Sequence, residues 1–265
     1  MIKFIILIQT VFSVWFLNLC SAQNIEPAIK IRFRVESSVT STSENGKFAY
    51  HYNVVCSSSS EQKIWLFGVF IATSIPVNDI KSPQNWAGDL APRGAVSWGG
   101  LGASGRISPG DSLNGFSFNS PALPAILDSY AQGFVPLPLP VDHVDETTSA
   151  QPDFEQDIVR FTTMGPSSFT FTNSISAISH LITLKHQAYS LGWISGPGAE
   201  GIVNSLDAKL DAALKAAQKG KDKTAQKEFK AFLNEIEAQK NKTFNNNVYQ
   251  LLKLNAEYIL GKLAA

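Results

Sequence analysis

The sequence has little sulfur and no excess of charge of either sign. Its 265 residues include 2 cysteines and 2 methionines, and 22 basic residues offset 22 acidic ones, so the formal net charge is zero. A chain of balanced charge gives no electrostatic reason to bind nucleic acid, which attracts basic proteins. We therefore expect no nucleic-acid partner.

A long hydrophobic run occurs only at the N-terminus. Lys3 precedes an apolar stretch over Phe4–Leu19, and the small residues Ser21 and Ala22 follow it. This three-part layout is typical of an export signal, so we predict a signal peptide over residues 1–22. A membrane anchor is the alternative, but the run is broken by polar residues and is shorter than the roughly 18 to 20 residues that span a bilayer. We expect a secreted or periplasmic protein with no stable membrane span after cleavage.

Cysteine is too scarce to build a disulfide framework. Cleavage after Ala22 removes Cys20, and Cys56 then has no partner in the chain. A lipid anchor on Cys20 is a weaker alternative, because Leu19 stands where such a signal has a small residue. Cys56 ends an alternating run, which favours a small buried apolar role over a reactive or intermolecular thiol. The fold must then depend on packing alone.

The first half of the chain alternates apolar and polar residues with a period of two. Ile29–Val35 and Phe48–Val54 alternate in this way on either side of Asn45-Gly46, a dipeptide typical of a hairpin turn. Further strands are predicted over residues 64–72, 95–98, 113–120, 127–135 and 157–163. Because no helical pattern long enough for a crossover separates them, we expect an antiparallel β-sandwich over residues 23–165.

After Pro166 the apolar residues recur with the period of a helix. We predict four amphipathic helices that pack into a bundle over residues 166–265, which makes the whole chain an α+β protein. Asn173 and Ser174 are candidate caps of the first helix, and Asn204 and Ser205 of the second. The predicted apolar stripes are Ile175, Ile178, Ile182, Lys185 and Tyr189; Leu206, Leu210, Ala213, Leu214 and Ala217; Ala225, Phe229, Phe232, Leu233 and Ile236; and Val248, Leu251, Leu252, Asn255 and Ile259.

Two motifs bear on cofactors and metals. Gly100, Gly102 and Gly105 have the spacing of a dinucleotide-binding loop, but no helix pattern follows them to hold a pyrophosphate, so we expect no cofactor. The acidic segment Asp142–Glu146, which includes His143, could hold calcium or zinc, yet it lacks regular ligand spacing. His180 and His186 are six residues apart on a helix and point about 240° from each other, so they do not share one metal.

Catalytic motifs are equally scarce. The sequence contains no Gly-x-Ser-x-Gly elbow, so we name no catalytic residue. Trp65, Trp86 and Trp98 lie in or beside predicted strands and are candidate ligand contacts, because exposed aromatic rings stack on sugars. Their alternative role is to fill the core or cover its edge.

The helical half resembles a known family. The segments Leu181-Ile-Thr-Leu-Lys-His, Asn204-Ser-Leu-Asp-Ala-Lys-Leu-Asp-Ala-Ala-Leu, Ala231-Phe-Leu-Asn-Glu-Ile-Glu-Ala-Gln and Leu251-Leu-Lys-Leu-Asn-Ala-Glu-Tyr-Ile are similar to the C-terminal helical FIMAH domain of secreted bacterial proteins. The resemblance covers about residues 174–263, and the turn at Asn241-Lys242 departs from the glycine-lysine that the family usually has. It implies an accessory, non-catalytic module of a bacterial extracellular protein.

These observations predict a non-enzymatic secreted protein that contacts a macromolecule of the envelope or extracellular space. Polysaccharide is a candidate partner, which makes a carbohydrate-binding module the second reading. A hydrolase with its site in the sandwich loops is the third. A coplanar exposed pair among Trp65, Trp86 and Trp98 would favour sugar binding, whereas a cleft with converging carboxylates would favour hydrolysis.

Overall fold

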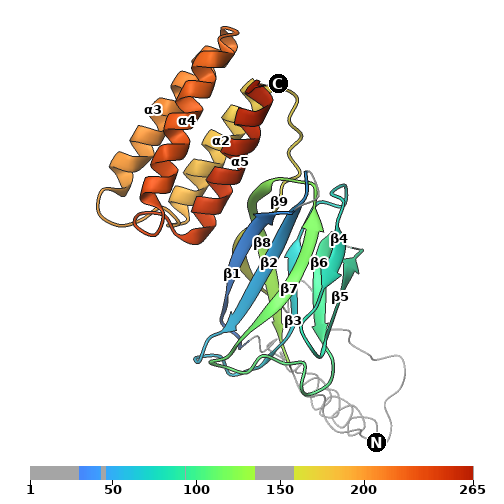
Figure 1. The fold of residues 1–265 in the computed structure, drawn as a ribbon. Coiled ribbons are helices and arrows are strands. Elements are labelled where there is room, and N and C mark those ends of the chain that lie inside the picture. Colours follow the sequence, from blue (N-terminus) through green and yellow to red (C-terminus); the bar gives the residue numbers. More distant parts are fainter. Residues whose placement is uncertain (1–29, 43–45, 93, 135–157, 265) are drawn as a thin grey trace, which may run out of the picture.

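The chain folds into two packed β-sheets followed by four helices (Figure 1). A computed structural model describes residues 30–42, 46–92, 94–134 and 158–264. The predicted signal peptide and the acidic segment Asp142–Glu146 lie outside these residues. The predicted fold class, an antiparallel sandwich followed by a four-helix bundle, is confirmed.

Both sheets are antiparallel throughout. One has the strand order β1-β2-β7-β4 and the other β5-β6-β3-β8-β9. The bounds are β1 Phe33–Ser41, β2 Phe48–Cys56, β3 Ile64–Phe70, β4 Asn78–Lys81, β5 Trp86–Ala91, β6 Ala95–Gly100, β7 Ser112–Ser120, β8 Pro124–Gly133 and β9 Val159–Pro166.

The first two strands form the hairpin that the alternating pattern predicts. They pair in register from Phe33 opposite Cys56 to Ser41 opposite Phe48, and Gly46 takes a positive φ of 81° in the turn. Strands β4 and β5 were not predicted from the sequence. Both are short and largely exposed, so they lack the alternation of apolar residues that marks a half-buried strand.

Aromatic side chains fill the space between the two sheets. Phe67 of β3 and Trp98 of β6 stack with their ring centroids 5.5 Å apart, and Tyr52 of β2 packs edge-on to Phe67. The Tyr52 hydroxyl donates a hydrogen bond to the carbonyl of Met164, so this buried polar group is satisfied. Cys56 is buried with a free thiol, and burial raises its pKa, in agreement with the apolar role expected for it.

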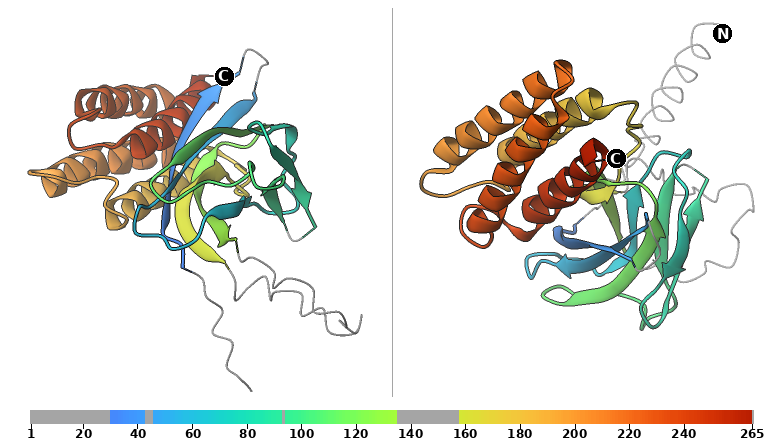
Figure 2. Two further views of the ribbon diagram at one scale, coloured as in Figure 1. Left: turned by 90° about the horizontal axis from the view of Figure 1, so that it is seen from below. Right: turned by 45° about the horizontal axis from the view of Figure 1, so that its top comes forward.

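The helices form two layers beside the sandwich. Helices α2 (Ser174–Ser190) and α5 (Asn246–Ala264) contact the strands, whereas α3 (Ala199–Gln218) and α4 (Asp222–Gln239) lie on the outer side (Figures 1 and 2). No described helix is long and apolar enough to cross a membrane.

The predicted stripes are right for α3, α4 and α5 but shifted for α2. In α2 the buried side chains are Ala177, Ile178, Leu181, Leu184, Lys185 and Ala188. Ile175 and Tyr189, which the sequence placed on the buried face, are more than a third exposed. The predicted caps Asn204 and Ser205 are also wrong, because α3 begins earlier, at Ala199 behind Gly198.

The change from strands to helices lies between Pro166 and Ser174, and the helical layer is attached to the sandwich by hydrogen bonds as well as by apolar contacts. The Val39 N–H of β1 donates to Gln250 Oε1 of α5 over 2.8 Å. Asn255 Nδ2 of α5 donates to the Pro124 carbonyl of β8 over 2.9 Å. The division into two domains near residue 165 remains a prediction.

Candidate ligand-binding site

The three candidate tryptophans do not form a binding surface. Trp98 has no exposed surface and its Nε1 donates to the Lys81 carbonyl, while Trp86 is 5% exposed and packs edge-on to Phe116. The expectation that these two contact a ligand is therefore wrong, because both belong to the core. Trp65 of β3 is half-buried, so the three rings form no coplanar exposed pair.

A cleft of about 420 Å³ opens instead in the helical half. It lies between the segment that links β9 to α2, the first turns of α2 and α4, and the last turns of α5. Its volume is in the range of small-ligand sites. The residues that give it chemical character are Phe171, Thr172, Asn173, Asp222, Tyr258 and Lys262.

Local structure fixes the wall formed by the linking segment. The Asn173 side chain accepts the Ser176 N–H over 2.8 Å, and the Ser176 hydroxyl in turn accepts the Asn173 N–H over 3.3 Å. This capping box sets the direction in which the chain enters α2 and places Phe171 beside the helix. On the opposite wall, Gln226 Nε2 of α4 donates to the Leu263 carbonyl over 2.7 Å and joins α4 to the end of α5.

Phe171 and Tyr258 line the cleft, and Phe169 and His180 pack behind Phe171. Phe171 lies with its ring centroid 5.3 Å from that of Tyr258, and Phe169 stacks on His180 at 4.1 Å with an interplanar angle of 4°. Burial lowers the pKa of His180, and its Nε2 has no hydrogen-bond partner among the described residues. His180 therefore packs as a neutral aromatic ring and supports the cleft wall.

The cleft lining combines two aromatic residues with polar groups that donate and polar groups that accept hydrogen bonds. Thr172 offers a hydroxyl, Asp222 a carboxylate and Lys262 an ammonium group, which lies 5.5 Å from the Tyr258 ring centroid. Such a lining can stack against a flat apolar face and also bond to donors and acceptors at its edge.

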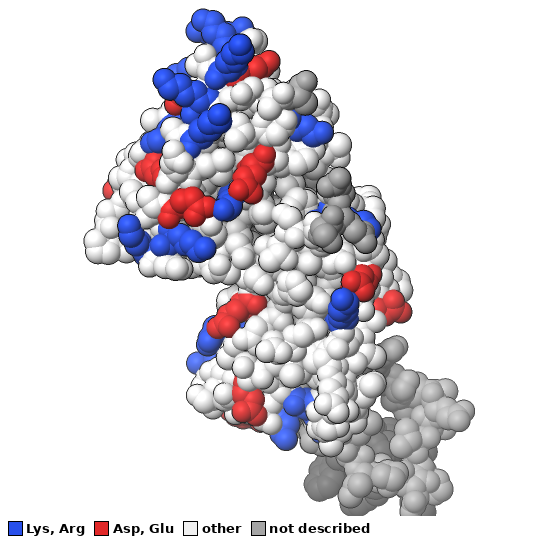
Figure 3. Space-filling view, in the orientation of Figure 1, with Lys and Arg blue, Asp and Glu red and all other residues white. Residues whose placement is uncertain are grey.

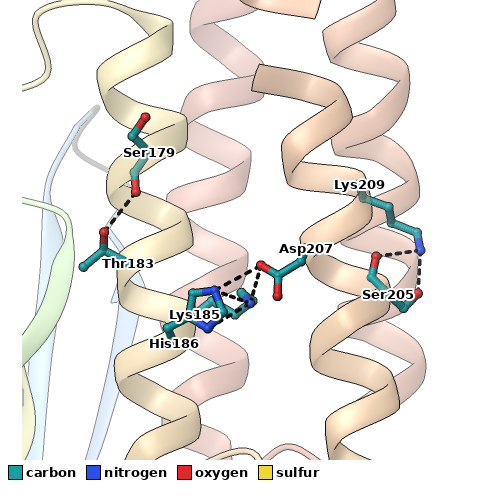
Figure 4. Close-up of polar contacts among 7 residues, drawn as sticks. All are labelled: Ser179, Thr183, Lys185, His186, Ser205, Asp207 and Lys209. Carbon is teal, nitrogen blue, oxygen red and sulfur yellow. Dashed lines mark hydrogen bonds and ion pairs between the residues drawn. The ribbon is translucent and has the colours of Figure 1, made fainter. Parts of the chain in front are cut away.

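A second polar cluster lies between α2 and α3, with Lys185 buried and His186 exposed (Figure 4). The Lys185 Nζ, which is fully buried, is 2.6 Å from Asp207 Oδ1, and His186 Nε2 is 3.2 Å from the same oxygen. Burial lowers the pKa of Lys185, and the hydrogen bond and negative charge of Asp207 oppose that shift. The cluster joins two helices and does not open onto the cleft lining.

The other sequence motifs take no part in this site. The glycines Gly100, Gly102 and Gly105 connect β6 to β7 by a turn, and Gly100 and Gly105 approach so closely that a side chain on either would collide with backbone. The described residues contain no group of three His, Cys, Asp or Glu side chains that could hold a metal. His180 and His186 make separate contacts, the first with Phe169 and the second with Asp207.

Sequence reasoning missed the cleft because its residues come from three separate segments, around residues 171–177, at Asp222 and over residues 258–263. One local signal was present: Phe169 and Phe171 alternate with polar residues directly before the helix cap at Asn173. Aromatic side chains in a short link between two elements do not belong to the apolar face of a strand or helix. Such rings must pack on a neighbouring surface or remain exposed.

Residues 179–261 match the FIMAH domain family, and the matched range lies within the four helices. This confirms the resemblance found in the sequence. Among curated proteins, none matches the chain.

Two solved structures are similar to parts of the chain. An uncharacterized protein from Nocardia farcinica with an immunoglobulin-like fold is 13% identical, with 49% of this chain and 96% of that chain covered and a TM-score of 0.31. A biomass-sensoring module from Clostridium thermocellum, described as resembling a family 3 carbohydrate-binding module, is 12% identical, with 34% of this chain and 64% of that chain covered and a TM-score of 0.24. At these TM-scores neither similarity carries an argument about ligand or fold.

Proposed function

We propose that this protein is an exported, non-catalytic binding module and that its cleft takes a saccharide unit of an extracellular polymer. One observation carries the proposal. The rings of Phe171 and Tyr258, 5.3 Å apart and inclined by 37°, line a cleft of about 420 Å³ together with hydroxyl, amide, carboxylate and ammonium groups.

The chemistry of a sugar ring fits this lining. A pyranose has apolar C–H faces and a rim of hydroxyl groups that both donate and accept hydrogen bonds. An aromatic ring covers the face, while Asp222 accepts from hydroxyl groups and Lys262 donates to them. Tyr258 is 36% exposed, so part of the residue is available to a partner.

The export layout at residues 1–22 and the FIMAH match over residues 179–261 support an extracellular partner for this cleft. Neither identifies the polymer. A macromolecular contact through the sandwich and a hydrolase site in its loops are the competing functions, and one experiment separates all three.

The test is a glycan array probed with the full chain and with two tyrosine variants. We expect Tyr258→Ala to weaken binding to the best saccharide about tenfold, because it removes one aromatic face worth roughly 1 kcal/mol or more. Tyr189→Ala is the matched control: Tyr189 is also a helical tyrosine, 38% exposed, but it does not line the cleft. This variant should bind as the parent chain does.

Equal losses in both variants, or binding that neither changes, would place the ligand elsewhere and refute the cleft as its site. Release of shortened saccharides from the bound glycan would overturn the non-catalytic reading.

A further inference from the structure

The end of the bundle where α3 turns into α4 carries an unbalanced positive charge. Residues 215–230 contain six lysines but only two acidic residues, Asp222 and Glu228, in a chain whose formal net charge is zero. Figure 3 shows basic side chains gathered at this end, the part of the helical half farthest from the sandwich. We call this surface the lysine tip; its members, all exposed, are Lys215, Lys219, Lys221, Lys223, Lys227 and Lys230.

Several of the described lysines outside the tip pair with a carboxylate: Lys30, Lys81, Lys185, Lys209 and Lys253 each lie within 4 Å of a carboxylate oxygen. Single exposed lysines such as Lys63 and Lys242 have no such pair with a described residue, so the tip is distinguished by the number of lysines in one short segment. No member of the lysine tip forms an ion pair with a described residue, although Asp222 and Glu228 belong to the same segment. An ordinary solvated helix surface mixes both signs in similar numbers, whereas this segment has six lysines and two acidic residues.

The turn itself brings these charges together. Lys219 and Gly220 follow the last residue of α3, and Gly220 takes a φ of 65°. The Lys221 N–H donates to the Ala216 carbonyl and the Gly220 N–H to the Ala217 carbonyl, which is the hydrogen-bond pattern of a Schellman turn. Because these hydrogen bonds fix a short turn, the lysines at the end of α3 and at the start of α4 stay close to one another.

Helix electrostatics do not explain all of these lysines. Lys215 and Lys219 stand at the C-terminal end of α3, where a cation is favourable. Lys221 and Lys223, however, stand at the N-terminal end of α4, where the partial positive charge of the helix disfavours a cation. Their positions weaken the helix slightly and strengthen the positive field of the tip.

We propose that the lysine tip binds an acidic polysaccharide. This inference goes beyond the saccharide cleft and does not rest on it, although Asp222 lies both in the tip segment and in the cleft lining. A flexible polymer with carboxylate or sulfate groups at intervals matches long lysine side chains that act as separate point charges.

Other anionic polymers fit less well. No large hydrophobic side chain of residues 215–230 is exposed, so the tip has nothing to insert into a membrane interface. The segment contains no arginine for bidentate contacts with phosphate, and its one aromatic residue, Phe229, is fully buried and so cannot stack on bases. Membranes and nucleic acid therefore serve as alternative outcomes of the test.

The experiment measures binding of the full chain to immobilised polygalacturonate from low to physiological salt. We expect affinity to fall as salt rises, because exposed charges are screened. The double variant Lys221→Gln/Lys223→Gln should flatten this salt dependence by about two in logarithmic slope, one for each lysine removed, as happens when lysines that bind nucleic-acid phosphates are replaced. The same variant should unfold at the same or a higher temperature than the parent, because it relieves the unfavourable charge at α4.

Three controls make the outcome decisive. Lys63→Gln/Lys242→Gln removes two exposed lysines far from the tip and should leave binding unchanged. Lys221→Arg/Lys223→Arg keeps the charge and should bind as the parent does. Tyr258→Ala should retain polygalacturonate binding even if it abolishes binding of neutral saccharides, so the lysine tip and the cleft are tested separately.

Any of four results overturns the proposal: no binding to polygalacturonate at low salt, equal losses in the two lysine-to-glutamine variants, tighter binding to phosphatidylglycerol vesicles, or tighter binding to duplex DNA.

Discussion

At the scale of single residues, Lys185 is the side chain whose environment is least expected. The sequence places it on an apolar stripe, and the structure buries its ammonium group completely, 2.6 Å from Asp207. The stripe position was predictable from the helical period. The partner was not, because Asp207 belongs to another helix and its own period marks it only as a polar residue.

Replacing Asp207 by asparagine should destabilise the protein strongly. The change leaves the Lys185 charge buried without its carboxylate, and breaking a buried pair from one side costs about 3 to 5 kcal/mol. Asp207 is partly exposed, so we expect the low end of that range. Urea unfolding at neutral pH measures the loss. Adding Lys185→Met to Asp207→Asn should recover most of it, because the buried charge is then gone.

The single variant Asp207→Asn should regain stability at alkaline pH. Burial lowers the native pKa of Lys185 below its unfolded value of about 10.4, so the unfolded chain binds the extra proton between these two values and stability rises with pH there. Without Asp207 the native pKa falls further and the window widens. The deficit of Asp207→Asn should therefore shrink as pH rises toward 10.4, while the double variant, which lacks the titrating lysine, shows no such recovery. A deficit independent of pH would mean that Lys185 is not the charge responsible.

At the scale of elements, the pairing of β8 with β9 ends in two prolines that face each other. Pro124 lies opposite Pro166, and neither residue has an N–H to donate. The Asn255 side chain of α5, 1% exposed, donates to the Pro124 carbonyl over 2.9 Å and to the Leu251 carbonyl over 2.8 Å. A helix side chain thus supplies the donor that the sheet lacks at this point.

We expect Asn255→Leu to cost about 1 to 3 kcal/mol, the usual penalty for leaving a buried acceptor unsatisfied. Asn234→Leu on the exposed surface of α4 is the control, since it makes the same change in helix propensity without a buried partner. Chemical denaturation compares the two. If both variants lose the same small amount, the Asn255 bond contributes nothing to the attachment of α5.

The elements that the sequence predicts best are those whose apolar residues keep a strict period. The β1–β2 hairpin and helices α3 to α5 have such a period, and their buried residues agree with it. Strands β4 and β5 do not, because pairing with a neighbour rather than burial holds them in the sheet. Trp86 and Trp98 show the same limit for the site: the sequence placed them in or beside predicted strands, but only packing against the other sheet, where both contact Phe116 of β7, decides that they are buried.

At the scale of the whole molecule, the question is whether the sandwich and the helices unfold together. Buried apolar residues of the strands and of all four helices belong to one cluster, which favours coupling, and α2 and α5 are the helices that pack against the strands. Helices α3 and α4 lie in the outer layer (Figure 2), where α3 packs against α2 and α4, and α4 packs against α5. A substitution that removes packing in α4 should therefore destabilise the helical bundle first. It affects the sandwich through α5 and α2, the helices that contact the strands.

Phe232→Ala is such a substitution. Phe232 has no exposed surface and packs edge-on to Phe229, so its removal should cost roughly 3 to 5 kcal/mol. We predict that the helical region over residues 174–263 unfolds at lower denaturant concentration while the sandwich keeps its β signal. Circular dichroism and limited proteolysis, with fragments followed from each half, measure the unfolding of the helices and of the sandwich separately.

Phe169→Ala, which truncates a phenylalanine that is 38% exposed, is the matched control and should shift neither transition by a comparable amount. Loss of both halves in a single transition would show that the contacts of α5 and α2 with the strands make one cooperative core, and the predicted division near residue 165 would then be wrong.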